Sequence, residues 1–429
     1  MEMLKIHNNP PRREWPALTA RCTRQEGEIT ERVAAILSQV RTGGDKALRD
    51  LVARIEGYVP ERFEVSRRQR TEAAKAVPQR LKTALAIAKS NIEAFHRAQL
   101  PPQVDIEVMP GVRCVQRAVA IGRVGLYVPG GNAPLFSTVL MLALPARIAG
   151  CGEVILCTPA GRGGKIAPEV LFAADLCGVD RIFAVGGAQA VAAMAYGTES
   201  IPHVEKIFGP GNRYVTRAKQ LVSTEAVAVD LPAGPSEVMV LADNSARAEF
   251  VAADLLSQAE HGPDSQTVLL TPSRGLAEQV AREVERQLAA LPRRQTAALA
   301  IENSRIVVLD SPDEMIEMSN AYAPEHLILS VEDPWAVAER ITAAGSVFLG
   351  NYTPESAGDY ASGTNHTLPT YGWARSMSGV NLDSFLRKIT YQQITPDGLR
   401  GLGPTIETMA SAEGLDAHRN AVTIRLESL

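Results

Sequence analysis

The feature of the sequence that most constrains the fold is a regular alternation of short apolar runs with alanine-rich runs, which begins near Val119. One series of apolar runs comprises VGLYV, EVILC, RIFAV, VEKIF and AVAVD, and a second comprises VMVLA, TVLLT, RIVVL, HLILS and SVFLG. Uninterrupted apolar strands separated by helices are typical of parallel sheets that are covered on both faces. The sequence therefore predicts an α/β fold with two doubly wound, Rossmann-like lobes, each with a crevice at the carboxyl ends of its strands.

The segments that flank these series have other patterns. Apolar residues at helical spacing predict two helices within residues 29–55, with a break at Gly43-Gly44, and a further helical region over about residues 71–100. Apolar residues alternate along residues 104–108 and lead into Pro110-Gly111, which predicts a hairpin. The chain after about residue 381 has no further strand pattern, so we expect a helical tail.

Composition excludes several classes of protein. The 429 residues are 45% hydrophobic and 21% charged with a net charge of −4, as in an ordinary globular protein. There is no basic stripe with interleaved aromatic residues, which argues against a nucleic-acid partner. No apolar run approaches the roughly 18 residues of a membrane span, and the N-terminus lacks the apolar core of a signal peptide. We expect a cytoplasmic protein that binds neither nucleic acid nor membrane.

The five cysteines give no sign of a disulfide framework or of a thiolate zinc cluster, because none forms a CxxC pair. Cys151 and Cys157 flank the run GEVILC, where buried thiols commonly serve packing. A catalytic thiol that forms covalent adducts is a minority alternative.

Three turns that follow strands of the first series are rich in glycine: PGGN at 129–132, GGAQ at 186–189 and GPGN at 209–212. Each precedes the start of a helix, where backbone N–H groups can bind an anion. None matches the GxGxxG fingerprint, and PAGRGGK lacks the first glycine of a GxxxxGK[ST] loop. Two interpretations stay open, ordinary turn chemistry, which is favoured, and a nucleotide site.

Four histidines lie near polar partners that suit metal binding or acid–base chemistry. Gln258 and His261 are three residues apart at the end of a predicted helix, and so lie on one face of it. The other patterns are Glu325-His326, the polar loop 359–366 and the tail residues 413–418. Each also fits a structural role, as a histidine beside helix-terminal carbonyls or in a hydrogen-bonded loop.

Seven long motifs distributed along the chain point to one known family. They are GLYVPGGNAPLFSTVLMLALPARIAGC, IFGPGNRYVT, DLPAGPSEV, DLLSQAEHGPDSQ, APEHLI, ESAGDYASGTNHTLPTYG and IETMASAEGLDAHRNAVTIRL. Together they closely resemble the histidinol dehydrogenase family. The resemblance covers nearly the whole chain, and motifs of this length are highly specific.

The resemblance implies a zinc-dependent enzyme that oxidises L-histidinol to L-histidine through histidinal and reduces two NAD molecules per turnover. The implied zinc ligands are Gln258, His261, Asp359 and His418. The implied substrate contacts are these four ligands together with Ser236, His326, His366 and Glu413. The implied NAD contacts are Tyr127, Gln189 and Asn212, and the implied catalytic pair is Glu325 and His326.

These residue types suit the implied chemistry. Two imidazoles, a carboxylate and an amide oxygen suit Zn²⁺ with a position left for substrate, although the sequence does not distinguish zinc from manganese. The metal is expected to hold the imidazole and amino groups of the substrate. His326 is the expected base in both oxidations, and Glu325 is expected to activate the water that hydrates the aldehyde.

The resemblance also implies a division of the chain. Residues 1–22 form an N-terminal segment, and residues 23–126 and 236–380 form a lobe with the N-terminal helices and most metal and catalytic residues. Residues 127–235 form the lobe with the NAD turns. Residues 381–429 form a helical tail that reaches the site of a partner subunit, so we expect a homodimer with shared active sites.

Three alternatives remain open on the sequence. A zinc hydrolase, in which Glu325-His326 activates water, predicts turnover without NAD and gives the glycine-rich turns no role. A non-catalytic zinc-bridged dimer suits the ligand set poorly, because structural zinc commonly uses cysteines and fills all its positions. The closest alternative is a related dehydrogenase that acts on another small alcohol.

Overall fold

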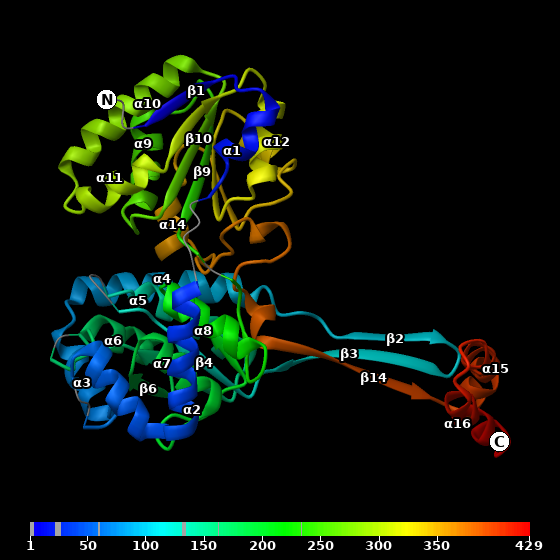
Figure 1. Ribbon diagram of the computed structural model, residues 1–429. Coiled ribbons are helices and arrows are strands. Elements are labelled where there is room, and N and C mark those ends of the chain that lie inside the picture. Colours follow the sequence, from blue (N-terminus) through cyan, green and yellow to red (C-terminus); the bar gives the residue numbers. More distant parts are fainter. Residues whose placement is uncertain (1–3, 22–26, 59–60, 131–133, 162, 233) are drawn as a thin grey trace.

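The chain forms two α/β lobes and an extended arm (Figure 1). The computed structural model describes residues 4–21, 27–58, 61–130, 134–161, 163–232 and 234–429. A six-stranded lobe holds the N-terminal strand, a five-stranded lobe lies next to it, and the arm projects from the five-stranded lobe to the last two helices (Figure 1). None of the helices in the described ranges combines the length and apolar character that a bilayer crossing requires.

The sheet of the six-stranded lobe is entirely parallel, in the order β1-β11-β10-β9-β12-β13. Its strands are β1 (Lys5–Asn8), β9 (Glu237–Ala242), β10 (Gln266–Thr271), β11 (Arg305–Val308), β12 (His326–Ser330) and β13 (Ser346–Leu349). From β9 the chain winds in one direction to β11 and then in the other to β13. The switch point therefore lies between β9 and β12.

The sheet of the five-stranded lobe is also parallel and has the same winding, in the order β6-β5-β4-β7-β8. Its strands are β4 (Arg123–Tyr127), β5 (Glu153–Thr158), β6 (Arg181–Ala184), β7 (Lys206–Phe208) and β8 (Ala228–Val229). The switch point lies between β4 and β7. The prediction of two doubly wound parallel lobes is confirmed.

Alternating side chains of each strand point to opposite faces of a sheet, and helices cover both faces. In the six-stranded lobe, Val238 and Val240 pack with α9 (Ala248–Ala259), α10 (Arg274–Ala290) and α11 (Arg294–Glu302). Met239 and Leu241 pack on the other face with α1 (Trp15–Leu18) and α12 (Pro312–Tyr322). The shorter elements are η1 (Arg12–Glu14), α13 (Pro334–Ala338), α14 (Glu355–Tyr360) and η2 (Trp373–Arg375).

In the five-stranded lobe, Val154 and Leu156 pack with α4 (Gln79–Arg97), α5 (Phe136–Ala149) and α6 (Pro168–Leu176). Ile155 and Cys157 pack on the opposite face with α2 (Gly27–Glu56), α7 (Gly187–Tyr196) and α8 (Arg213–Ser223).

The N-terminal helices belong to the five-stranded lobe, which differs from the predicted division that joined residues 23–126 to residues 236–380. Helix α2 packs on α7 and α8, α3 (Arg67–Ala76) packs on α6, and α4 packs on α5. The apolar stripe of α2 shows that it must cover a sheet but does not say which one. The predicted break in this helix is present at Gly44, whose φ is 51°.

The arm is a three-stranded antiparallel sheet in the order β14-β3-β2. The predicted hairpin is confirmed as β2 (Val104–Met109) and β3 (Val112–Ala120), with Gly111 at a φ of 75° in its turn. The prediction of a wholly helical tail is wrong, because β14 (Leu386–Ile394) precedes α15 (Pro396–Ala412) and α16 (Asp416–Leu426). In β14 two adjacent polar pairs, Arg387-Lys388 and Gln392-Gln393, interrupt the alternation, whereas β2 alternates although it is equally exposed.

The short helix η3 (Leu382–Phe385) anchors the arm in the core of the five-stranded lobe. The ring of Phe385 is fully buried and stacks on Phe208, with 4.1 Å between the ring centroids. The N–H of Ile121 donates to the carbonyl of Phe385 at 3.0 Å, which ties η3 to the base of β3. Phe385 is thus the aromatic anchor of the base of the arm, and the bond from Lys206 Nζ to the carbonyl of Ser384 at 2.9 Å adds to it.

Replacing Phe385 by alanine tests how much this aromatic anchor contributes to stability. Phe385→Ala should lower the free energy of unfolding by about 3–5 kcal/mol, because it deletes a fully buried phenyl group and leaves a cavity. Urea-induced unfolding would measure the change. Ile87→Ala, which removes a side chain that is 58% exposed on α4, should alter the free energy by less than about 0.5 kcal/mol. A loss of under about 1 kcal/mol for Phe385→Ala would contradict the role of the anchor.

Candidate active site

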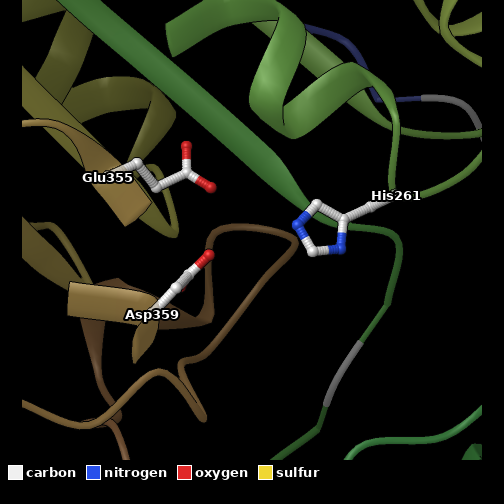
Figure 2. Close-up of side chains that lie close together, drawn as sticks. All are labelled: His261, Glu355 and Asp359. Atoms are coloured by element: carbon white, nitrogen blue, oxygen red, sulfur yellow. The ribbon is translucent and has the colours of Figure 1, made fainter. Parts of the chain in front are cut away.

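Three potential metal ligands converge beside the six-stranded sheet. His261 follows α9 and its C-cap Glu260, and Glu355 and Asp359 are one turn apart on α14. The two carboxylates and the imidazole face a common space (Figure 2), and their potential ligand atoms all lie within 4.8 Å of one another. An imidazole nitrogen with carboxylate oxygens is a donor set that suits a divalent cation such as Zn²⁺.

Glu325 and His326 lie at the amino end of β12, next to this metal group. Glu325 Oε2 accepts a hydrogen bond from the backbone N–H of Glu237 at 2.9 Å, and His326 Nδ1 lies 3.3 Å from the carbonyl oxygen of the same residue. His326 Nε2 lies 3.7 Å from Asp359 Oδ1 and has no hydrogen-bond partner among the described residues. Strand β9 therefore fixes the pair while one imidazole nitrogen faces the metal group.

The charges of this cluster shift its protonation equilibria. Burial raises the pKa of Glu325 and that of Glu355 to about 8. Burial disfavours the imidazolium form of His326, but the carboxylates of Glu355, Glu325 and Asp359 outweigh it and raise the pKa of His326 to about 10. Desolvation lowers the pKa of His261, which favours the neutral, metal-binding imidazole. Buried carboxylates at this density favour a bound cation.

Gln258 is fully buried in the last turn of α9, beside the metal group. With the amide oriented so that both its polar atoms are satisfied, Gln258 Oε1 accepts from the N–H of Glu237 at 2.8 Å and Nε2 donates to Glu355. The structure thus brings Gln258 to the site, where its oxygen is engaged by the backbone and its nitrogen supports a carboxylate.

His366 links the two lobes at the site. Its Nδ1 lies 2.8 Å from the carbonyl oxygen of Asp359, and its Nε2 lies 3.3 Å from Thr138 Oγ1 on α5 of the five-stranded lobe. Burial lowers the pKa of His366, so the ring is neutral near pH 7. The ring is held between the metal-binding helix and the opposite lobe.

The three residues predicted to contact NAD lie at the carboxyl edge of the five-stranded sheet. Tyr127 ends β4, and its hydroxyl accepts from the N–H of Gly187 at 3.0 Å. Gln189, in the first turn of α7, donates to Glu56 Oε1 at 2.9 Å. Asn212 caps α8 by accepting from the N–H of Tyr214 at 3.0 Å. Residues 131–132 of the first glycine-rich turn lie outside the described residues.

A cavity of about 660 Å³ lies between the two lobes. Asn212 and Arg213 line it from α8, Ser236 lines it from the start of β9, and His261 lines it from the end of α9. The five-stranded lobe therefore presents the carboxyl ends of its strands to this space, as predicted. The six-stranded lobe presents the amino ends of its strands, which differs from the predicted crevice at its carboxyl edge.

Glu413 and His418 lie away from the other predicted site residues of the same chain. Glu413 caps α15 and His418 is in α16, at the tip of the arm (Figure 1). Both side chains are exposed. Within one chain the structure does not bring them to His261.

Comparison with known proteins decides the family. The family model described as histidinol dehydrogenase matches residues 19–426. The chain belongs to the histidinol dehydrogenase family. The histidinol dehydrogenase of Bacteroides thetaiotaomicron is 56% identical over 427 residues and is covered completely, as is this chain. That of Escherichia coli K12 is 51% identical over 427 residues, covering 97% of this chain and 98% of the relative.

A solved structure agrees with the sequence comparison. The crystal structure of histidinol dehydrogenase from Elizabethkingia anophelis matches with a TM-score of 0.98 and 49% identity, covering 100% of this chain and 99% of that one. The family resemblance predicted from the motifs is confirmed, and the protein is an oxidoreductase.

Glu355 is the residue of the site that the motif comparison with the histidinol dehydrogenase family did not single out. The sequence predicts a polar loop at 359–366, whereas Asp359 and Tyr360 are the last two residues of α14, which begins at Glu355. Glu355 and Asp359 are four residues apart, the spacing that places two side chains on one face of a helix. Recognising ESAGDY as one helical turn and a half would have revealed the second carboxylate.

The buried cysteines are unsuited to nucleophilic catalysis in this member of the histidinol dehydrogenase family. Burial raises the pKa of Cys151 to about 11 and that of Cys177 to about 12, and it raises the pKa of Cys157 further. A thiol acts as a nucleophile in its thiolate form, which these surroundings disfavour. Cys114 lies on the arm, and Cys22 lies outside the described residues.

The protonation of the site predicts how metal-free protein responds to pH. Glu325 and Glu355 have pKa values of about 8 against an ordinary 4.5, and His326 has about 10 against 6.5. Between pH 7 and 9 the folded state therefore binds more protons than the unfolded state, and stability falls as pH rises. The pKa values of His261 and His366 are lowered from 6.5, so these two groups change the stability only below pH 7.

Thermal unfolding of chelator-treated protein at pH 7, 8 and 9 would measure the effect. The unfolding midpoint should decrease across this series, and saturating zinc should flatten the decrease because a bound cation neutralises the carboxylates. A midpoint that is constant or increases from pH 7 to 9 in metal-free protein would contradict this account of the cluster.

Proposed function

We propose that this chain is a zinc- and NAD-dependent histidinol dehydrogenase that oxidises L-histidinol to L-histidine through histidinal, reduces two NAD molecules per turnover, and acts in the cytoplasm. The observation that carries the proposal is the cavity between the lobes. Its wall combines Asn212, a predicted NAD contact, with Ser236, a predicted substrate contact, and His261, a predicted metal ligand. The family membership supports the choice of histidinol.

The residues of the chain fit the proposed cofactors. Gln258, His261 and Asp359, with Glu355 next to them, would hold the metal, and Tyr127, Gln189 and Asn212 would contact NAD. When bound, the metal supplies a Lewis-acidic anchor for the substrate and NAD supplies the hydride acceptor. Buried carboxylates around His261 and a hydrogen-bond-free Nε2 on His326, among the described residues, are consistent with a cation between them.

His326 serves as the base of both oxidations in this proposal. Its Nε2 takes the proton of the alcohol as hydride leaves the carbinol carbon, and it then releases this proton to solvent. In the second oxidation it takes a proton of the aldehyde hydrate as the second hydride leaves. Two of the three carboxylates that raise the pKa of His326, those of Glu355 and Asp359, belong to the metal group, so the neutral imidazole becomes available once a bound cation neutralises their charge. Glu325 orients and deprotonates the water that hydrates the aldehyde.

The arm supports a homodimer with shared sites. Its strands and tip expose large apolar side chains, which a soluble chain rarely leaves uncovered over so long an element: Val104, Ile106, Val108, Ile389, Tyr391, Ile394, Met409, Leu415 and Ile424. A second copy would cover them. His418 would then complete the metal ligands of that copy, and Glu413 would contact its substrate.

A steady-state assay with L-histidinol and NAD tests the proposed reaction. We expect two NADH per histidinol consumed, loss of activity on chelation and recovery with zinc. His326→Ala should lower kcat by about 10²–10⁴-fold, the usual contribution of a general base. Release of a product without NADH would favour a hydrolase, and turnover of another small alcohol but not histidinol would favour a related dehydrogenase.

Subunit exchange between two inactive variants tests the shared site. A mixture of His261→Ala and His418→Ala chains should regain about one quarter of wild-type activity, because half of the randomly exchanged dimers contain one intact site. Each variant alone serves as the control and should remain inactive. Absence of activity after verified exchange would show that each site is built from one chain.

A further inference from the structure

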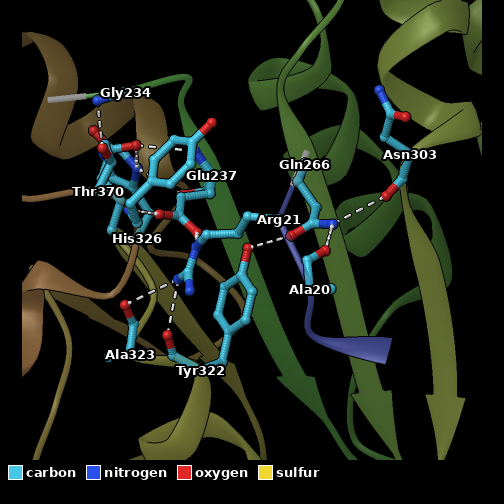
Figure 3. Close-up of polar contacts among 12 residues, drawn as sticks. Ala20, Arg21, Gly234, Glu237, Gln266, Asn303, Tyr322, Ala323, His326 and Thr370 are labelled. Atoms are coloured by element: carbon cyan, nitrogen blue, oxygen red, sulfur yellow. Dashed lines mark hydrogen bonds and ion pairs between the residues drawn. The ribbon is translucent and has the colours of Figure 1, made fainter. Parts of the chain in front are cut away.

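Three passages of the chain between the lobes meet at one buried carboxylate. The first passage leaves α1 toward α2 and carries Arg21, the second joins β8 to β9 and ends at Glu237, and the third follows α14 and carries Tyr371. Glu237 Oε2 accepts from Arg21 Nε at 2.6 Å, and Glu237 Oε1 accepts from the backbone N–H of Tyr371 (Figure 3). One side chain therefore ties the three passages together.

Arg21 is fixed on its other sides as well. Its Nη2 donates to the carbonyl of Tyr322 at 2.8 Å, and its guanidinium carbon lies 3.9 Å from the centroid of the Tyr322 ring. The Tyr322 hydroxyl donates to Gln266 Oε1 at 2.7 Å, and Gln266 Nε2 donates to the carbonyl of Ala20 at 3.1 Å (Figure 3). The side chains of Arg21 and Glu237 are only 14% and 3% exposed, so water screens the ion pair weakly.

The ion pair between Arg21 and Glu237 also holds two residues that have unusual backbone conformations. Tyr371 has a φ of 56° and Ala323 a φ of 52°, a region that residues other than glycine rarely adopt. The Tyr371 N–H donates to Glu237, and the Ala323 carbonyl lies 3.4 Å from Arg21 Nη2. Such conformations persist where the surrounding contacts determine them, and they cluster at functional sites.

The main chain of Glu237 carries this constraint to the catalytic pair. Its N–H donates to Glu325 Oε2 at 2.9 Å, and its carbonyl oxygen lies 3.3 Å from His326 Nδ1. A displacement of Glu237 would therefore move both groups, and the carboxylate of the same residue is held by Arg21 (Figure 3).

We propose that Arg21 and Glu237 are positioning residues of the active site. With Tyr322 and Tyr371 they form a clasp at the amino edge of the six-stranded sheet, which holds the start of β9 and, through it, Glu325 and His326. This inference rests on the proposed function of that pair. It assigns a role in the reaction to an arginine of the N-terminal segment that acts through Glu237 and through the carbonyls of Tyr322 and Ala323, which lie just before Glu325.

The variant Arg21→Met tests the clasp. It should lower kcat for histidinol oxidation by about 10- to 100-fold, because a displacement of reacting groups by about 1 Å has an effect of this size. The KM for histidinol and the zinc content should stay within about threefold of wild type. Exchange of the Tyr371 amide hydrogen, followed by mass spectrometry, should become faster. Arg21→Lys keeps the charge but not the fork of donors, so its kcat should fall about three- to tenfold.

Arg70 provides a matched control. Its side chain is also 14% exposed, and it also binds one carboxylate, that of Asp175, and two backbone carbonyls, those of Val179 and Asp180. It lies on α3 of the five-stranded lobe, away from the passages. Arg70→Met should lower the thermal midpoint to a degree similar to Arg21→Met and leave kcat within about twofold of wild type.

Several outcomes would overturn the clasp. One is a kcat for Arg21→Met that lies within about twofold of the kcat for Arg70→Met. Another is an exchange rate of the Tyr371 amide hydrogen that is the same in Arg21→Met as in wild type. If Arg21→Met does not fold, Arg21→Lys decides, and a wild-type kcat for it refutes the proposal. Wild-type protein that does not oxidise histidinol would instead overturn the proposed function, and the exchange measurement would then decide the clasp by itself.

Discussion

The two sheets face each other with opposite edges, and the rest of the structure depends on this arrangement. In a parallel sheet every strand begins at one edge and ends at the other. The six-stranded sheet turns its amino edge to the cavity, so Ser236, Glu325 and His326 lie where strands begin. The five-stranded sheet turns its carboxyl edge to the same space, where Asn212 starts a helix after β7. Residues far apart in sequence thus meet because each is next to a strand end.

The polar interior between these edges is organised around negative charge. Glu325 and Glu355 are buried. Glu325 accepts from the N–H of Glu237, which also donates to the amide oxygen of Gln258, and Glu355 accepts from the amide nitrogen of Gln258. Uncompensated carboxylates in such surroundings cost several kcal/mol unless they are protonated or neutralised by a cation. Metal binding, protonation of the carboxylates and substrate binding therefore affect one another, because each of them changes the net charge of the site.

Sequence patterns were sufficient for the strands and for the two parallel lobes, because buried strands such as VMVLA are apolar throughout. They were insufficient for β14, where the adjacent polar pairs Arg387-Lys388 and Gln392-Gln393 interrupt the alternation. Periodicity also carries no information on which sheet α2 covers or which edge faces the cavity. The motifs identified His261, Glu325, His326 and Asp359 but passed over Glu355, and no pattern in the sequence points to the contact between Arg21 and Glu237.

The pairing of β1 with β11 has a consequence for synthesis of the chain. Lys5 lies opposite Arg305, so the first strand finds its place in the sheet only after about 300 further residues have been made. At roughly 5–20 residues per second this interval is about 15–60 seconds, long enough for the intervening five-stranded lobe to form first. Strand β1 therefore cannot pair until β11 has been made, and the nascent polypeptide must keep it from premature association until then.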